Sequence, residues 1–206
     1  MTMLYIFDEV DKMDDVIPES MISLLSEARI AKIQRLDSPL KKKASAAAYL
    51  LLRLALLEIY GIEKTVEFEY NEKGKPILRD YSHIYFNLSH SKRTVACAVS
   101  NAEVGVDVQH ISPISDQVAK RVLTEIEYNA FKDSKTPDKF FCEIWVIKES
   151  FLKKTGQGIT SELRDLTSES VTDKVIFEGK DYFCCACGSD MKIRHIGRGD
   201  FEQLYN

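Results

Sequence analysis

The sequence predicts an α+β protein built from two similar halves, each with a small, mainly antiparallel sheet and packed helices. Three observations predict this class. Helical runs with start and stop signals occur in both halves, strand-like segments lie around them, and two runs of small residues resemble each other. These runs are T-V-A-C-A-V-S at 94–100 and Y-F-C-C-A-C-G-S at 182–189. We therefore expect one half over residues 1–102 and the other over 103–206.

The first half is predicted to place strands around one long helix. Weak alternation over residues 1–7 favours an edge strand, and apolar residues at helical spacing favour a helix within 18–36. A serine–proline pair and a later glycine are typical of a helix start and a helix end, which predicts a helix over 39–60. Further strands are expected at 65–70, 84–89 and 94–99, with a glycine–proline turn at 71–76.

The second half opens with the pattern V-G-V-D-V-Q at 104–109. Side chains alternate along a strand, so the three valines share one face, and Gly105, Asp107 and Gln109 share the other. The same signals predict helices at 114–123, 125–132 and 137–155, and strands within 172–196.

Composition limits the function classes. The chain has 206 residues, of which 45% are hydrophobic and 29% charged, as expected of a packed, soluble protein. A formal charge of −4 provides no overall basic field for nucleic acid. The first ten residues lack the basic start of a signal peptide, and the longest apolar run is too short for a bilayer. Five cysteines are expected to be reduced, which favours the cytoplasm.

Glu149 and Lys153 are the first candidates for chemistry. They lie four residues apart on an apolar stretch of the predicted helix, beside Trp145, the only tryptophan. A carboxylate and an amine in such a place are costly to bury unless they are paired, metal-bound or used in a reaction. A plain salt bridge on the helix surface explains the spacing equally well.

Three other clusters suggest a site for a metal and phosphates. Asp107 and Gln109 could supply oxygen ligands to Mg²⁺ from one strand face. Ser89 and His90, followed by two basic residues, could bind a phosphate. Lys41, Lys42 and Lys43 lie in the first turn of a helix, where an anion is favoured. A solvated strand face, a polar turn and solvated lysines are the respective alternatives.

The order of these motifs resembles a known family. G-K-P at 74–76, F-N-L-S-H-S at 86–91 and G-V-D-V-Q at 105–109 precede W-V-I-K-E-S-F-L-K-K-T-G-Q-G at 145–158. This order is similar to that of the 4′-phosphopantetheinyl transferases of the surfactin-synthetase-activating type. The last motif is long and specific, and the match covers residues 74–158.

The resemblance implies two pseudo-symmetric halves with coenzyme A and Mg²⁺, or alternatively Mn²⁺, in the cleft between them. It implies transfer of the 4′-phosphopantetheine arm to a serine of an apo acyl or peptidyl carrier protein, with release of adenosine 3′,5′-bisphosphate. A monomer is expected, since one chain supplies both halves of the cleft, and neither nucleic acid nor a membrane is expected as a partner.

The resemblance also implies roles for individual residues. Asp107, Gln109, Glu149 and Glu127 match metal-binding positions, and Glu149 is also the candidate general base. Lys153 and His90 match groups that contact the coenzyme A phosphates, and both are expected, with Asp107, to be catalytic. The nucleotide side is matched by Lys75, Pro76 and Ser89. Lys32 and Lys42 are candidates for the 3′-phosphate.

One departure from the family pattern stands at Gln109, where the family usually has glutamate. An amide oxygen can still coordinate Mg²⁺ but carries no charge, so altered metal dependence is expected. Two other classes remain open from the residues. One is a Mg²⁺-dependent nucleotide phosphohydrolase that uses Asp107 and Glu149, and the other is a non-catalytic module that binds coenzyme A or a carrier.

Overall fold

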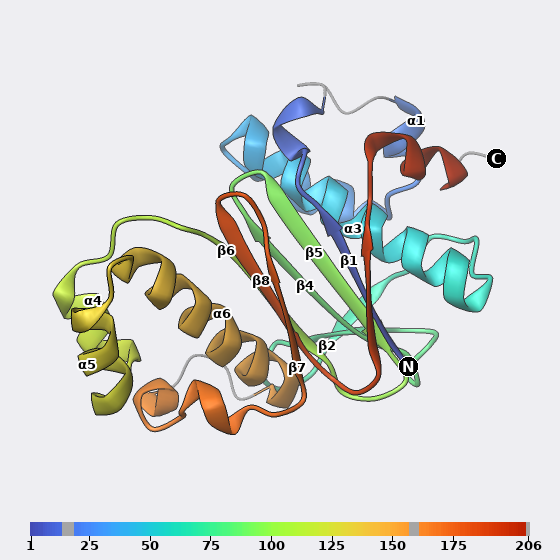
Figure 1. Cartoon of the computed structure of the whole chain (residues 1–206). Coiled ribbons are helices and arrows are strands. Elements are labelled where there is room, and N and C mark those ends of the chain that lie inside the picture. Colours follow the sequence, from blue (N-terminus) through green and yellow to red (C-terminus); the bar gives the residue numbers. More distant parts are fainter. Residues whose placement is uncertain (14–18, 157–160, 205–206) are drawn as a thin grey trace.

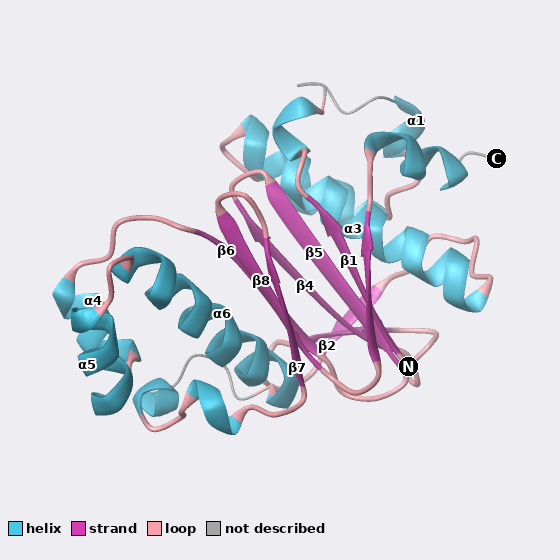
Figure 2. Cartoon of the chain, viewed as in Figure 1, coloured by secondary structure: helices cyan, strands magenta, loops and turns pink. Residues whose placement is uncertain are grey.

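The computed structural model describes residues 1–13, 19–156 and 161–204. Two β-sheets pack against each other, with helices on both outer sides (Figures 1 and 2). The nine strands are β1 (Thr2–Phe7), β2 (Phe68–Tyr70), β3 (Pro76–Leu78), β4 (Tyr85–Ser91), β5 (Thr94–Ser100), β6 (Gly105–His110), β7 (Lys174–Glu178), β8 (Tyr182–Cys187) and β9 (Met191–His195) in the described part of the chain. The helices there are α1 (Glu19–Ile22), α2 (Glu27–Gln34), α3 (Pro39–Tyr60), α4 (Asp116–Val122), α5 (Glu125–Asp133) and α6 (Pro137–Thr155), with short 3-10 helices at Val10–Lys12, Ser161–Arg164, Ser168–Ser170 and Arg198–Leu204.

The larger sheet has the strand order β4-β5-β1-β9, and the second sheet has the order β6-β8-β7. Strands β2 and β3 form a hairpin that is a separate two-stranded sheet. The α+β class is confirmed. The two small-residue runs at 94–100 and 182–189 both supply central strands, β5 and β8. Alanines and cysteines on these strands have little bulk, so the two sheets approach closely and share a buried core with Val104 and the two valines of β6.

Helix α3 lies on the outer face of the larger sheet, and α6 lies on the outer face of the second sheet (Figure 1). The predicted bounds of α3 are confirmed: Pro39 is in its first turn, and Gly61 ends it in the left-handed conformation with φ of 66°. Helix α6 ends in the same way at Gly156, with φ of 67°. Gly158, at the end of the long motif, lies outside the described residues.

Two sequence predictions about the first half are wrong. The strand over 1–7 is not an edge strand, because β1 pairs with β5 on one side and with β9 on the other. The helical pattern at 18–36 forms two helices, α1 and α2, rather than one. Ser26 separates them, since its hydroxyl accepts a hydrogen bond from the backbone N–H of Arg29 at 3.3 Å and caps α2.

The C-terminal strands also cross between the two predicted halves. β7 and β8 belong to the second sheet, as the tail pattern predicts. β9, however, runs parallel to β1 and completes the larger sheet, which otherwise consists of strands from residues 1–102. The first half therefore depends on a strand from the end of the second.

The seam between the two sheets is closed by side chains of β4. The backbone N–H groups of Val106, Val108 and His110 donate to side-chain oxygens of the facing strand. The acceptors are Asn87 Oδ1 at 2.9 Å, Ser89 Oγ at 3.2 Å and Ser91 Oγ at 3.2 Å. This ladder satisfies buried N–H groups of β6 without a backbone pair, and it fixes β6 beside β4. It gives the motif N-L-S-H-S a structural role.

All five cysteines are buried and free, as predicted. Among residues 1–13, 19–156 and 161–204, none of the helices has both the length and the apolar character that a bilayer crossing requires.

Candidate active site

The candidate site forms where α6 packs directly on β6. Gly105 makes this close approach possible, because a Cβ atom there would lie 2.0 Å from the Ser150 carbonyl oxygen and 2.3 Å from the Lys154 backbone nitrogen. No side chain other than hydrogen fits in that space. The face of β6 that carries Gly105, Asp107 and Gln109 is thus covered by α6, and the alternative of a solvated strand face is wrong.

Asp107 is the centre of the site. Its Oδ1 atom accepts hydrogen bonds from Ser89 Oγ at 2.8 Å and from Lys153 Nζ at 2.5 Å. Lys153 also donates to Ser89 Oγ at 3.2 Å. Only 6% of Asp107 is exposed, so these contacts compensate the charge of a buried carboxylate. Lys153 forms its ion pair with Asp107 rather than with Glu149. The alternative of a plain Glu149–Lys153 salt bridge on the helix surface is therefore wrong.

Two buried oxygens in this site have no hydrogen-bond partner among the described residues: Asp107 Oδ2 and Glu149 Oε1. Burial raises the pKa of Glu149, and the nearby negative charge of Asp107 raises it further, while Lys153 acts in the opposite sense. A divalent cation bound here would be coordinated by both oxygens and would neutralise both negative charges. Mg²⁺ usually takes one or two carboxylates together with phosphate oxygens and water, so this pair fits it.

Basic groups lie near Asp107. His90 follows Ser89 on β4 and is exposed. Partial desolvation lowers the pKa of His90, and the nearby positive charges of Lys153 and Lys32 lower it further. His90, Lys153 and Lys32 therefore lie near one another, although they come from three different elements.

Arg29 is a basic residue that the sequence reasoning missed. It is 8% exposed, has no carboxylate partner in the described part of the chain, and lies over the Phe68 ring at 5.2 Å. Together with Lys32 and Tyr70 it lines a small pocket beside α2. The available signal was the spacing of Arg29 and Lys32, which places both on one face of a short helix.

The other residues expected to contact the nucleotide are Lys75, Pro76 and Lys42, and their surroundings differ. Lys75 donates to the backbone carbonyls of Lys154 at 2.9 Å and Val104 at 3.4 Å, so its turn is attached to the C-terminal end of α6. Pro76 begins β3 directly after this turn. Lys42 has no hydrogen bond or ion pair to a cleft residue among those described.

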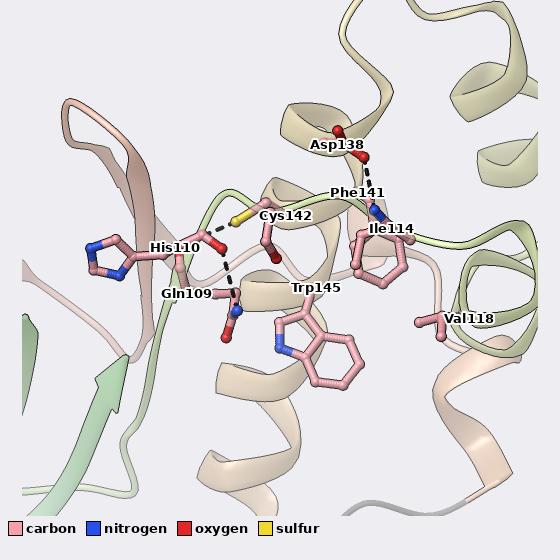
Figure 3. Close-up of a pocket in the computed structure, with 9 residues that line it drawn as sticks. Gln109, His110, Ile114, Val118, Asp138, Phe141, Cys142 and Trp145 are labelled. Atoms are coloured by element: carbon pink, nitrogen blue, oxygen red, sulfur yellow. Dashed lines mark hydrogen bonds between the residues drawn. The ribbon is translucent and has the colours of Figure 1, made fainter. Parts of the chain in front are cut away.

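Two residues implied as metal ligands make other contacts. The Gln109 side-chain amide donates to the His110 carbonyl at 3.3 Å, and Gln109 borders a cavity that Cys142 and Trp145 also line (Figure 3). Glu127 lies on α5 and does not complete a group of three with Asp107 and Glu149, since no three acidic, histidine or cysteine side chains are placed to hold a metal ion in the described residues.

Glu127 instead forms a buried pair with Lys148, a residue that the sequence reasoning left unassigned. Lys148 is 0% exposed and donates to Glu127 Oε2 at 2.6 Å and to the carbonyls of Val122 and Leu163 at 2.8 and 3.0 Å. Glu127 also accepts from the backbone N–H groups of Thr124 and Ser168. These contacts join α6 to α5 and to the segments on either side, which favours a structural role for the pair.

Fold and site together are typical of an enzyme that handles a phosphate-bearing substrate: two buried carboxylates with open oxygens lie beside a lysine and a histidine. Comparison with known proteins gives the family. Residues 103–194 match the family model of the 4′-phosphopantetheinyl transferase superfamily. The chain belongs to this family.

Several relatives support the assignment. The 4′-phosphopantetheinyl transferase gsp of Aneurinibacillus migulanus is 33% identical over 178 residues, which are 76% of this chain and 74% of that protein. The 4′-phosphopantetheinyl transferase Sfp of Bacillus subtilis (strain 168) is 31% identical over 148 residues, which are 70% of this chain and 66% of that protein. The transferase HetI of Nostoc is 35% identical over 155 residues, which are 69% of this chain and 65% of that protein. The chain thus spans slightly less than two thirds of the length of the Bacillus and Nostoc proteins.

Proposed function

We propose that this protein transfers 4′-phosphopantetheine from coenzyme A to a serine of an apo acyl or peptidyl carrier protein. The observation that supports this most is the pair of open carboxylate oxygens, Asp107 Oδ2 and Glu149 Oε1, next to Lys153 and His90. A pyrophosphate needs both kinds of group: carboxylates that hold a cation, and fixed positive charges.

In the proposed reaction, the serine oxygen of the carrier attacks the phosphorus that bears pantetheine. The bond from this phosphorus to the bridging oxygen breaks, and adenosine 3′,5′-bisphosphate leaves with that oxygen. Glu149, directly or through water, accepts the serine proton. Lys153 and His90 lie where negative charge collects on the leaving phosphate, and Lys32 and Arg29 extend this positive surface toward the adenosine side.

The metal would be held by Asp107 and Glu149, and Mg²⁺ or Mn²⁺ at this position would neutralise charge on the pyrophosphate. Gln109 remains a proposed weaker ligand through its amide oxygen. A titration of transfer activity against Mg²⁺ for wild type and Gln109→Glu tests this role. If the two titration curves coincide, Gln109 does not touch the metal.

The decisive experiment is mass spectrometry of apo carrier proteins after incubation with the enzyme, coenzyme A and Mg²⁺. We expect one phosphopantetheine to be added per carrier, and Glu149→Gln and Asp107→Asn to lower the rate by about 10²-fold or more. Glu143→Gln, on the same helix and outside the carboxylate pair, is the matched control and should retain activity. Hydrolysis of coenzyme A without gain of mass on any carrier would favour a phosphohydrolase instead.

The partners and location follow the same proposal. Ser89, Asp107 and Lys153 come from both sequence halves of one chain, which supports a monomeric enzyme. Five buried free thiols agree with a reducing compartment such as the cytoplasm.

A further inference from the structure

Helix α6 borders a groove of about 380 Å³ on the side that does not carry the candidate active site. The groove lies between α5, α6, the 3-10 helix at Ser168–Ser170 and strand β7. Successive residues of an α-helix are turned by about 100°, so Ile144 and Ile147 face roughly opposite to Glu149. The apolar side chains that line the groove are Ile126, Ala130, Phe140, Ile144, Ile147 and Ile176.

Strand β7 is the outer strand of the second sheet, and in the described part of the chain it pairs with β8 alone (Figure 1). The Gly188 N–H donates to the Asp173 carbonyl at 3.0 Å. The Gly179 N–H donates to the Tyr182 carbonyl at 2.9 Å. In an antiparallel pair such bonds recur at every second residue, so the odd-numbered residues of β7 face β8. The backbone N–H and C=O of Ile176 therefore point to the free edge.

The opposite edge of the same sheet is closed, since the N–H groups of β6 donate to side chains of β4. An edge that has no such cover is a place where another strand can add. β7 has five residues and carries a charge at each end, on Lys174 and Glu178, and short charged edges limit indiscriminate pairing. A strand that adds to β7 must therefore match the groove as well as the backbone.

Apolar side chains lie on both sides of the groove. Ile176 packs on the residues between β8 and α6 and also borders the groove, so a side chain at the same level of an added strand would enter it. Ile126 on α5 is 79% exposed, more than any other large hydrophobic side chain among the described residues. An exposed apolar residue that continues an apolar groove is typical of an interaction surface.

The charges around the groove indicate which kind of segment fits. Glu143 and Glu169 border it and make no hydrogen bond or ion pair with other described residues. Glu127 is neutralised by Lys148, and the Lys174 ammonium already donates to two backbone carbonyls. The groove therefore has a net negative charge, which favours a partner with basic side chains.

We propose that an extended segment of a partner protein adds to β7 as a further strand, with aliphatic side chains in the groove and basic side chains beside Glu143 and Glu169. In this mode of recognition the main-chain hydrogen bonds provide affinity, and the groove selects the side chains. The segment has aliphatic residues flanked by lysine or arginine at alternate positions. The inference does not depend on the proposed transfer reaction, because the groove and Glu149 lie on different sides of α6.

A fluorescent peptide of the sequence K-T-I-T-I-T-K is the probe, because its isoleucines and lysines share one face of an extended strand. We expect fluorescence anisotropy to show saturable binding to the full chain, and binding about tenfold weaker for the charge-reversed peptide E-T-I-T-I-T-E.

Variants of the groove test the same probe. Glu143→Gln combined with Glu169→Gln should weaken its binding about three- to tenfold, as expected for two exposed ion pairs. Ile126→Ser should weaken it about tenfold, because the isoleucine loses an apolar contact. Val118→Ser is the matched control, since Val118 is an exposed aliphatic residue on α4 that does not border the groove.

N-methylation of the probe tests the pairing with β7. Only one alternate set of peptide amides can face β7, so methylation of either the isoleucine or the threonine amides should abolish binding, and methylation of the other set should preserve it. Equal binding of both methylated forms, equal binding of both charge forms, or no saturable binding of the probe would overturn the proposal. Displacement of the probe by an apo carrier would assign the groove to the transfer reaction. Sedimentation of wild type as a dimer and of Ile126→Ser as a monomer would assign it to a second copy of the chain, and either result would also overturn the proposal.

Discussion

The Ser89 hydroxyl donates a 2.8 Å hydrogen bond to Asp107 Oδ1 across the seam between β4 and β6. The same hydroxyl accepts from the Val108 N–H, so it is fixed from both sides. Asp107 is thereby oriented with its second oxygen left open beside Glu149. We expect Ser89→Ala to lower the apparent Mg²⁺ affinity in the transfer assay by about 10- to 100-fold, because partners that orient a metal ligand contribute on that scale.

The matched control for that variant is Ser91→Ala. Ser91 occupies the next position of the same ladder and accepts the His110 N–H, but it does not contact Asp107. Equal Mg²⁺ titrations for Ser89→Ala and wild type would show that this hydroxyl does not prepare the carboxylate.

Gly105→Ala should separate β6 from α6. The added methyl group would meet backbone atoms of α6, which cannot rotate away, so the overpacking should cost about 1–3 kcal/mol of unfolding free energy. Transfer activity should fall further than stability, because Lys153 and Glu149 move with the helix. Urea denaturation and the transfer assay check both effects. Gly199→Ala is the control, since nothing lies within 4 Å of a Cβ atom there.

The buried Lys148–Glu127 pair should be structural. Lys148→Met leaves a buried carboxylate without its cation and should cost about 3–5 kcal/mol of unfolding free energy. The double variant with Glu127→Gln should lose clearly less than the sum of the two single variants. The metal role implied for Glu127 would regain support if Glu127→Gln shifted the Mg²⁺ titration without changing stability.

The same pair predicts an acid-sensitive contribution to stability. Burial opposes the charge of Glu127, but hydrogen bonds from Lys148, Ser168 and Thr124 prevail and lower its pKa from the ordinary 4.5. A lowered folded pKa stabilises the protein above pH 4.5, and this stabilisation is lost as the pH falls through the folded value. Glu127→Gln should flatten the decline in unfolding free energy below about pH 4.5. Parallel pH curves for variant and wild type would contradict this assignment.

Lys32 and Lys42 were both candidates for the 3′-phosphate of coenzyme A, and the structure separates them. Lys32 lies near His90 and Arg29, whereas Lys42 has no described contact with the cleft. Lys32→Ala should raise the KM for coenzyme A by about tenfold and leave dephospho-coenzyme A unaffected, because only the former carries that phosphate. Lys42→Ala is the control, and an equal effect in both lysine variants would refute the distinction.

Local signals predicted much of this protein. Helices α3 and α6 are bounded by a proline at one end and a glycine at the other, and their predicted ranges are confirmed. The alternation in β6 correctly divided the valines from Asp107 and Gln109, because a strand has only two faces. The family could likewise be named from motifs that keep their order along the chain.

What could not be predicted depends on partners distant in sequence. The N-terminal strand looked like an edge strand because its neighbour β9 lies near the other end of the chain. The sequence around Lys148 does not indicate a buried ion pair, because the partner of Lys148 is a glutamate on another helix. Arg29 was overlooked for the same reason: its burial depends on aromatic rings of α3 and β2.

The parallel pairing of β1 with β9 has a consequence for how the chain folds. β1 leaves the ribosome before every other described strand, yet it acquires its second neighbour only after residue 195 has been made. Until then β1 presents a row of unpaired backbone groups, which other chains can join. Such long-range closure slows folding, and it makes truncation before β9 a route to aggregation rather than to an independent N-terminal fragment.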